Sequence, residues 1–293
     1  MRFELWSVWH ILYMISPVIL FGVIYFLVNK RSEKTKNLVG MVLGVISVLI
    51  LIVRNVDIYL RSGWDLEVIP LQVCHIGSLV AGFALIFKKK WLIATSFCFH
   101  LIPAFLAMVF ADSLANYDTL FKIRPQTYIW GHIFIVVCAL YGLLIYRPRL
   151  TKRDLIHSTV FVGSMSITAI LCNSAFRVLL DWEPNYFYLY NYKGTPLKFL
   201  YEALPTSTYG WFSINWFYTG TLFAVFVAVF IGLFFAAKLI IKKSREGQRP
   251  SPFCPINIWL QNPFGMIPFY SSSLYARRTT PFCASSLNSQ LIL

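Results

Sequence analysis

Charged side chains are scarce in this sequence: Asp, Glu, Lys and Arg make up 13% of its 293 residues, and only 12 residues are acidic. Soluble globular domains carry roughly 25% charged residues. Hydrophobic residues, in contrast, make up 58% of the chain, and aromatic residues make up 17%. This composition excludes an ordinary soluble domain and indicates an integral membrane protein.

The few acidic residues leave a formal net charge of +14. The Lys and Arg residues cluster between long apolar runs, so they indicate membrane topology and contact with anionic lipid headgroups. A nucleic-acid groove would need a soluble basic surface, which this chain lacks. We therefore expect membrane phospholipids as partners, either as substrate or as solvent, and no nucleic acid.

Paired cysteines are also missing. The six cysteines are scattered and form no C-x-x-C pair, and most of them fall inside apolar runs. This spacing argues against a zinc site and against a disulfide framework. No cleavable signal peptide is apparent at the N-terminus. We expect no metal and no organic cofactor.

Long apolar runs dominate what is present. A spanning helix needs about 20 mostly apolar residues, and the sequence predicts an all-α membrane protein, a bundle of seven transmembrane helices within residues 1–246. The predicted spans are Trp9–Val28, Leu38–Val53, Val68–Phe87, Trp91–Phe110, Tyr128–Tyr146, His157–Leu180 and Trp211–Ile241. The last run begins with an interfacial segment, and its span is expected at 216–241.

Most of the 26 Lys and Arg residues follow the first, third, fifth and seventh runs. Since cytoplasmic loops are enriched in these residues, the N-terminus is expected outside and the C-terminus inside. Residues 247–293 are rich in Ser, Pro and Asn and show no helical period. We expect them to form a disordered cytoplasmic tail.

The stretch IPLQVCHIGS, residues 69–78, places polar side chains at the start of a predicted span. Pro70 suits the first turn of a helix, so Cys74 is expected in its second turn. With the predicted directions of the spans, several polar residues fall at one membrane level near the outer face. They are Cys74, His75, His132, Asn173, Arg177 and Asn215.

A cysteine beside a histidine is the minimal nucleophilic unit for acyl transfer, because the imidazole removes the thiol proton. In this interpretation Cys74 is the nucleophile and His132 the base, with His75 beside them. Asn173 or Asn215 orients the imidazole or donates to an oxyanion. Arg177 holds a lipid phosphate. A structural alternative stays open for each, namely a buried thiol, interhelical hydrogen bonds and a surface ion pair of Arg177 with Asp181.

Four stretches resemble the YwaF-like integral membrane proteins, a family similar to a vertebrate acyltransferase that remodels ether phospholipids. They are PLQVC at 70–74, WGHI at 130–133, LCNS around Asn173, and NYFYL at 185–189, in matching order from about residue 6 to 241. The resemblance implies a membrane acyltransferase with the acyl group on Cys74, His132 as base, and Asn185 and Tyr186 beside Arg177 at the headgroup. It favours a bacterial cell membrane over an endomembrane.

Two alternatives remain at this point. The chain could be a transporter or channel component, for which His100 is the ionisable group nearest the middle of a predicted span. It could also be a ligand-sensing or assembly protein with a helical bundle.

Overall fold

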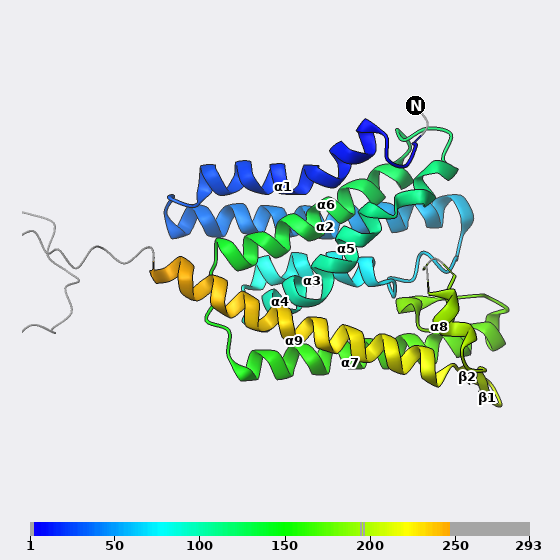
Figure 1. Cartoon of the computed structure of the whole chain (residues 1–293). Coiled ribbons are helices and arrows are strands. Elements are labelled where there is room, and N and C mark those ends of the chain that lie inside the picture. Colours follow the sequence, from blue (N-terminus) through cyan, green and yellow to red (C-terminus); the bar gives the residue numbers. More distant parts are fainter. Residues whose placement is uncertain (1–2, 194, 196, 247–293) are drawn as a thin grey trace, which may run out of the picture. The chain divides into compact units, whose positions relative to one another are not determined.

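The structure is a computed structural model that describes residues 3–193, 195 and 197–246. The tail expected at 247–293 lies outside the described residues. Within the described part, helices account for almost all regular structure (Figure 1). The long helices are α1 (Val8–Val28), α2 (Glu33–Ser62), α3 (Val73–Phe87), α6 (Ile123–Leu144), α7 (Lys152–Leu180) and α9 (Trp216–Glu246).

The fourth predicted span is one interrupted helix. It consists of α4 (Lys90–Thr95), a π-helical turn over Ser96–His100, and α5 (Leu101–Val109). Pro103 lies three residues after the π turn, and proline lacks the backbone N–H that would bond to the preceding helical turn, so the change of hydrogen bonding at this place has an identifiable cause. Single π turns inside helices are frequent at functional sites.

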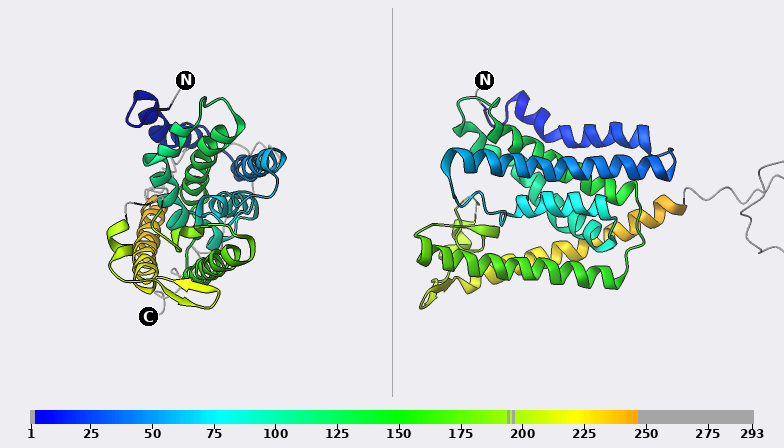
Figure 2. Two further views of the ribbon diagram at one scale, coloured as in Figure 1. Left: turned by 90° about the vertical axis from the view of Figure 1, so that its right-hand side faces the viewer. Right: turned by 180° about the vertical axis from the view of Figure 1, so that it is seen from behind.

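Short elements fill the connections. Two 3₁₀ turns cover Ala111–Asn116 and Tyr186–Tyr188, α8 covers Lys198–Glu202, and strands β1 (Ser207–Tyr209) and β2 (Phe212–Ile214) form an antiparallel hairpin with Tyr209 opposite Phe212. The views in Figure 2 show α8 and the hairpin at the same end of the bundle as the N-terminal start of α1. Gly210, with a φ of 60°, supplies the left-handed turn residue of this hairpin.

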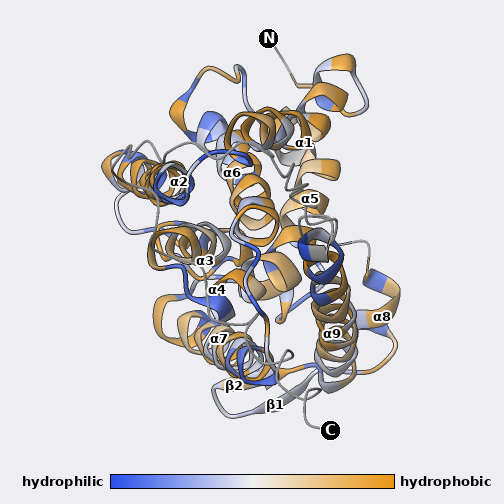
Figure 3. Cartoon of the chain, turned by 90° about the vertical axis from the view of Figure 1, so that its left-hand side faces the viewer, coloured by the Kyte–Doolittle hydropathy of each residue, from blue (hydrophilic) through white to orange (hydrophobic). Residues whose placement is uncertain are grey.

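Six helices in the described residues are long and apolar enough to cross a membrane: α1, α2, the segment Lys90–Val109, α6, α7 and α9. The remaining predicted span, Val68–Phe87, corresponds to α3, which has only 15 residues. Many large apolar side chains of these helices are exposed, including Phe26 on α1 and Leu60 on α2. Figure 3 shows hydrophobic residues along much of the length of the helices.

Several predicted boundaries were wrong. Helix α2 extends from Glu33 to Ser62, far beyond 38–53, because helical hydrogen bonding continues past the charged Arg54. Helix α3 begins at Val73, five residues after the predicted start. Pro70 disfavours helical backbone at the preceding residue and lies before the helix. Cys74 is consequently in the first turn of α3, not the second. The start of the last helix at Trp216 agrees with the prediction.

Helix α3 packs closely on α2 through small residues. A Cβ atom placed on Gly44 would lie 2.6 Å from the carbonyl oxygen of Gly82, and one on Gly82 would lie 2.7 Å from that of Gly44. Nearby, Ser47 donates to the carbonyl of Ser78 at 3.1 Å. Close backbone approach of this kind is how helices associate in membranes. It fixes the position of α3 and therefore of Cys74.

Candidate functional site

A polar cavity of about 400 Å³ lies at one end of the bundle, between α2, α3, α6 and the segment 183–193. Four of the residues singled out from the sequence line it: Cys74, His75, His132 and Asn185. The other polar residues of the lining, which the sequence analysis did not single out as site residues, are Arg54, Glu67, Gln72, Ser78, Tyr117, Arg124, Thr127, Tyr128, Glu183, Tyr188, Asn191 and Lys193. The mixture of a thiol, imidazoles and charged groups makes this cavity the candidate site.

Cys74 is half-buried at the second residue of α3. The first helical hydrogen bond runs from Ile76 to the carbonyl of Gln72, so the earlier N–H groups of the helix have no carbonyl partner within it. Negative charge that develops at the Cys74 sulfur is therefore met by the positive end of the helix dipole.

His132 lies one helical turn after Tyr128 on α6, and its Nδ1 atom is 2.7 Å from the Tyr128 carbonyl oxygen. A carbonyl oxygen can only accept, so Nδ1 carries the proton in the neutral ring and Nε2 is left as the acceptor. The Tyr128 ring also packs against the imidazole, with 4.3 Å between ring centroids. Tyr128 thus holds His132 in the tautomer that a general base requires.

An ion-pair network closes the cavity near Cys74. Arg54 of α2 donates to the Glu67 carboxylate at 2.6 Å and to the Glu67 carbonyl at 2.9 Å. The other carboxylate oxygen of Glu67 pairs with Arg124 at the start of α6. Asn55 adds a hydrogen bond of 2.9 Å to the Val68 carbonyl. These contacts tether the segment that leads into α3, and the two arginines leave one positive charge uncompensated by Glu67.

Asn173 does not face the cavity. Its side chain bonds both backbone groups of Tyr186, with the amide 3.0 Å from the Tyr186 carbonyl and the Tyr186 N–H 2.8 Å from the Asn173 oxygen. The Tyr186 hydroxyl donates to the Leu66 carbonyl at 2.9 Å. Burial raises the pKa of Tyr186 to about 12, so this hydroxyl stays a neutral donor. Both residues position the loop that covers the cavity.

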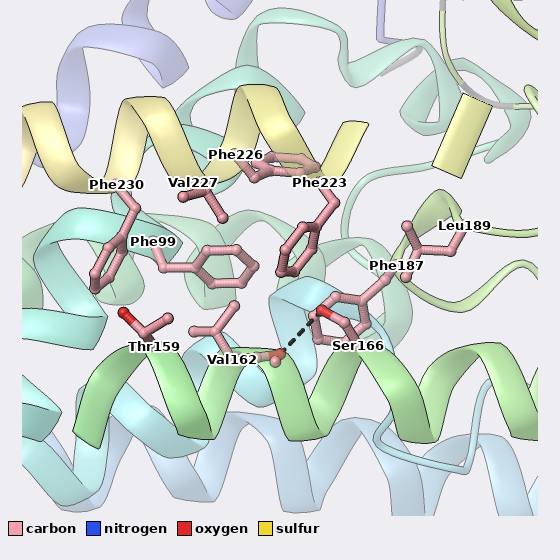
Figure 4. A pocket seen from close by; sticks show the side chains of 11 residues that line it. Phe99, Thr159, Val162, Ser166, Phe187, Leu189, Phe223, Phe226, Val227 and Phe230 are labelled. Carbon is pink, nitrogen blue, oxygen red and sulfur yellow. Dashed lines mark hydrogen bonds between the residues drawn. The ribbon is translucent and has the colours of Figure 1, made fainter. Parts of the chain in front are cut away.

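The NYFYL stretch, residues 185–189, lines both the polar cavity and a separate apolar slot. Asn185 and Tyr188 line the polar cavity, whereas Phe187 and Leu189 line an apolar slot of about 40 Å³ between α7 and α9. Figure 4 shows Phe99 of the π turn in this slot, between side chains of the two helices. The φ angles of Phe187 and Tyr188 are 58° and 55°, a left-handed backbone that is strained in large residues. Such strain is concentrated at functional sites.

Asn215 and Arg177 also lie away from the cavity lining. Asn215 caps α9: its amide donates to the carbonyls of Tyr201 and Leu204 at 2.9 and 2.8 Å, and its oxygen accepts from the Tyr218 N–H. The guanidinium of Arg177 lies over the Tyr190 ring, 5.5 Å from its centroid. The structure thus brings four of the eight singled-out residues to the cavity, and the other four contact the loops around it.

Sequence reasoning missed Arg54, Glu67 and Arg124. Arg54 directly follows the predicted span Leu38–Val53, and its charge was interpreted as marking the end of that span at the membrane surface. An arginine within one turn of the hydrocarbon region is itself a sign of a functional or paired group. That signal was available in the sequence, but its partner Glu67 could be found only from the path of the chain.

His100 is buried behind α3, where a Cβ on Gly77 would lie 3.1 Å from its Nδ1 atom. Neither ring nitrogen has a hydrogen-bond partner among the described residues. His100 therefore packs against the helix that carries Cys74 without lining the cavity itself.

We expect Asn173→Ala to destabilise the protein, because it leaves two buried backbone groups of Tyr186 without partners. The loss should be roughly 2–6 kcal/mol, at about 1–3 kcal/mol for each unpaired group. Equilibrium unfolding in detergent micelles measures it. The exposed Asn116, replaced by alanine, is the control and should change stability by less than about 0.5 kcal/mol. Equal effects of the two substitutions would contradict this role for Asn173.

Multiple apolar helices with lipid-facing side chains and a polar cavity at one end define a multi-pass α-helical membrane protein. The family model of the TMEM164 family matches residues 5–235, and the chain belongs to that family. All four stretches on which the family resemblance was based lie inside the matched range. No curated protein and no solved structure matches the chain.

Proposed function

We propose that this protein is a lipid acyltransferase in which Cys74 carries the acyl group and His132 is the general base. One observation carries the proposal: the thiol at the N-terminus of α3 and an imidazole with a fixed tautomer line the same cavity, together with two arginines. The protein is proposed to cross the membrane seven times, and the short helix α3 is one of these seven spans. The start of α1 and the end of α9 lie at opposite ends of the bundle (Figure 1), as an odd number of membrane passes requires.

The proposed orientation places the N-terminus and the cavity at the extracytoplasmic face, because the basic loops lie at the other end. At that level the cavity opens where the ester carbonyls of phospholipids lie. A bacterial cell membrane is the first setting in which to test the activity.

The reaction proceeds in two transfers. Nε2 of His132 takes the thiol proton, the sulfur attacks the ester carbonyl of a donor phospholipid, and a tetrahedral intermediate forms. The ester C–O bond then breaks, the lysophospholipid leaves with the proton from the imidazolium, and the acyl group remains on Cys74 as a thioester. The hydroxyl of an acceptor lipid next gives its proton to Nε2 of His132 and attacks the thioester carbonyl. The C–S bond then breaks, the new ester is released, and the thiolate takes the proton back from the imidazolium.

Arg54 and Arg124 are the proposed phosphate contacts. Both line the cavity, while Arg177 lies outside it on Tyr190. A guanidinium binds phosphate through paired N–H groups. Glu67 compensates one of the two charges, so the pair as a whole favours a monoanionic headgroup.

Arg124→Gln is expected to weaken binding of an anionic lysophospholipid about tenfold, because it removes one charge-assisted hydrogen bond. The Michaelis constant for the acceptor should rise while the maximal rate changes little. Arg177→Gln is the matched control, since it removes the same group outside the cavity. Titration of each variant in nanodiscs with a fluorescent lysophosphatidylglycerol, whose phosphodiester carries one negative charge, measures the dissociation constant. A larger effect from Arg177 would move the headgroup to the Tyr190 side.

The function itself is tested by trapping the thioester. Purified protein in nanodiscs is incubated with a phospholipid whose acyl chain carries a terminal alkyne, then quenched in acid and digested. We expect an alkyne-labelled, hydroxylamine-sensitive adduct on the peptide that contains Cys74. Labelling that is absent, or that is equal on Cys98 and Cys138, would refute a catalytic Cys74.

A further inference from the structure

A second, apolar groove of about 410 Å³ runs along α3, on the face turned away from the polar cavity. Its α3 side chains are Ile76, Leu79, Val80, Phe83 and Phe87. They follow the helical spacing of three and four residues, so they form one stripe. Cys74, His75 and Ser78 occupy the other face and line the polar cavity.

The groove has a floor and one closed end. Ile76, Val80 and Leu92 are buried at its base, and α7 supplies the opposite wall. The rings of Trp91 and Phe161 meet with their centroids 5.6 Å apart and close the end far from the cavity. The open side is flanked by Phe83 and Phe87, which are 37% and 59% exposed.

The groove and the cavity meet at the segment before α3. Pro70 and Leu71 line the groove, and Gln72 and Cys74 line the cavity. A ligand that bridges the two would therefore pass over the free N-terminus of α3, beside the Cys74 sulfur. From there the 15 residues of α3 extend roughly 21 Å, at 1.5 Å per residue.

We infer that this groove binds one acyl chain of the donor phospholipid, with the polar head in the cavity and the ester beside Cys74. The occupant is hydrocarbon because the segment Lys90–Val109 and α7, which flank the groove, are both long and apolar enough to span a membrane. The closed end at Trp91 and Phe161 limits the length of the chain that fits. This inference rests on the proposed function and adds a chain-length selectivity to it.

The experiment uses a phosphatidylcholine with a photoreactive diazirine at the end of one acyl chain, in nanodiscs. Irradiation and peptide mapping should give adducts on the peptides containing Trp91, Phe161 and Met165. These should be at least about tenfold more abundant than adducts on α1. Leu79→Trp, which fills the middle of the groove, should reduce them about tenfold and shift transfer toward donors with shorter chains. Leu171→Trp, on the exposed face of α7, is the control and should change neither.

Adducts spread over all exposed helices in proportion to their area would show annular lipid only and overturn the inference. A thioester on Cys74 together with such a spread would refute the groove and leave the proposed function intact. Groove adducts without any thioester would refute the function and with it the role of the groove in donor binding. The same adducts in Cys74→Ala show whether binding is independent of the thiol.

Discussion

Cys74→Ala abolishes acyl transfer in reconstituted vesicles, with an expected decrease of at least about 10³-fold in the maximal rate. A nucleophile that forms the covalent intermediate cannot be replaced by its neighbours, so its removal leaves only the contributions of binding and of oriented donors. Since alanine is a good helix former and the side chain is only half-buried, the fold of α3 should persist. Release of lysophospholipid, followed by mass spectrometry, measures the rate.

Two further substitutions separate chemistry from packing. Cys172→Ala removes another half-buried thiol, one on α7 that does not line the cavity, and should leave the rate unchanged. Cys74→Ser keeps the size of the side chain but supplies a hydroxyl that imidazole activates far less readily. Full acyl transfer by Cys74→Ser would exclude the thioester pathway.

The sequence predicted a common membrane level for Cys74 and His132. Alternate spans run in the same direction, so residues near the starts of the third and fifth predicted spans are expected at the same depth. The structure places these two residues on the same cavity, together with His75 and Asn185. Depth alone cannot tell which side of a helix faces which neighbour, and Asn173 shows the consequence. Asn173 was expected at the same depth, but its amide bonds the backbone of Tyr186.

The ends of the helices were predicted least well, for two different physical reasons. Hydropathy measures transfer to lipid and falls at Arg54, whereas backbone hydrogen bonds continue to Ser62. The start of α3 is set by Pro70 and by the tether of Glu67 to Arg54 and Arg124, which is a contact between distant parts of the chain. The same tether forms the charged part of the cavity. The contacts of Glu67 with Arg54 and Arg124 therefore explain both the unpredicted start of α3 and the unpredicted charged lining of the cavity.

His132→Ala is expected to lower the acyl-transfer rate by about 10²–10⁴-fold, the usual contribution of a general base. Loss of the side chain enlarges a cavity that already holds about 400 Å³, so free imidazole can enter. Added imidazole should restore part of the activity, in proportion to its unprotonated fraction. A variant that had merely lost structure would not respond in this way.

The comparison with His75 decides between two imidazoles in one cavity. His132 has its Nδ1 atom on the Tyr128 carbonyl, whereas Nδ1 of His75 has no hydrogen-bond partner among the described residues. A base needs a second group that fixes its orientation, and the Tyr128 carbonyl oxygen is such a group for His132. His75→Ala should therefore reduce the rate far less and show no rescue by imidazole. Rescue of His75→Ala with an unresponsive His132→Ala would assign the base to His75, and the Tyr128 contact would then serve packing alone.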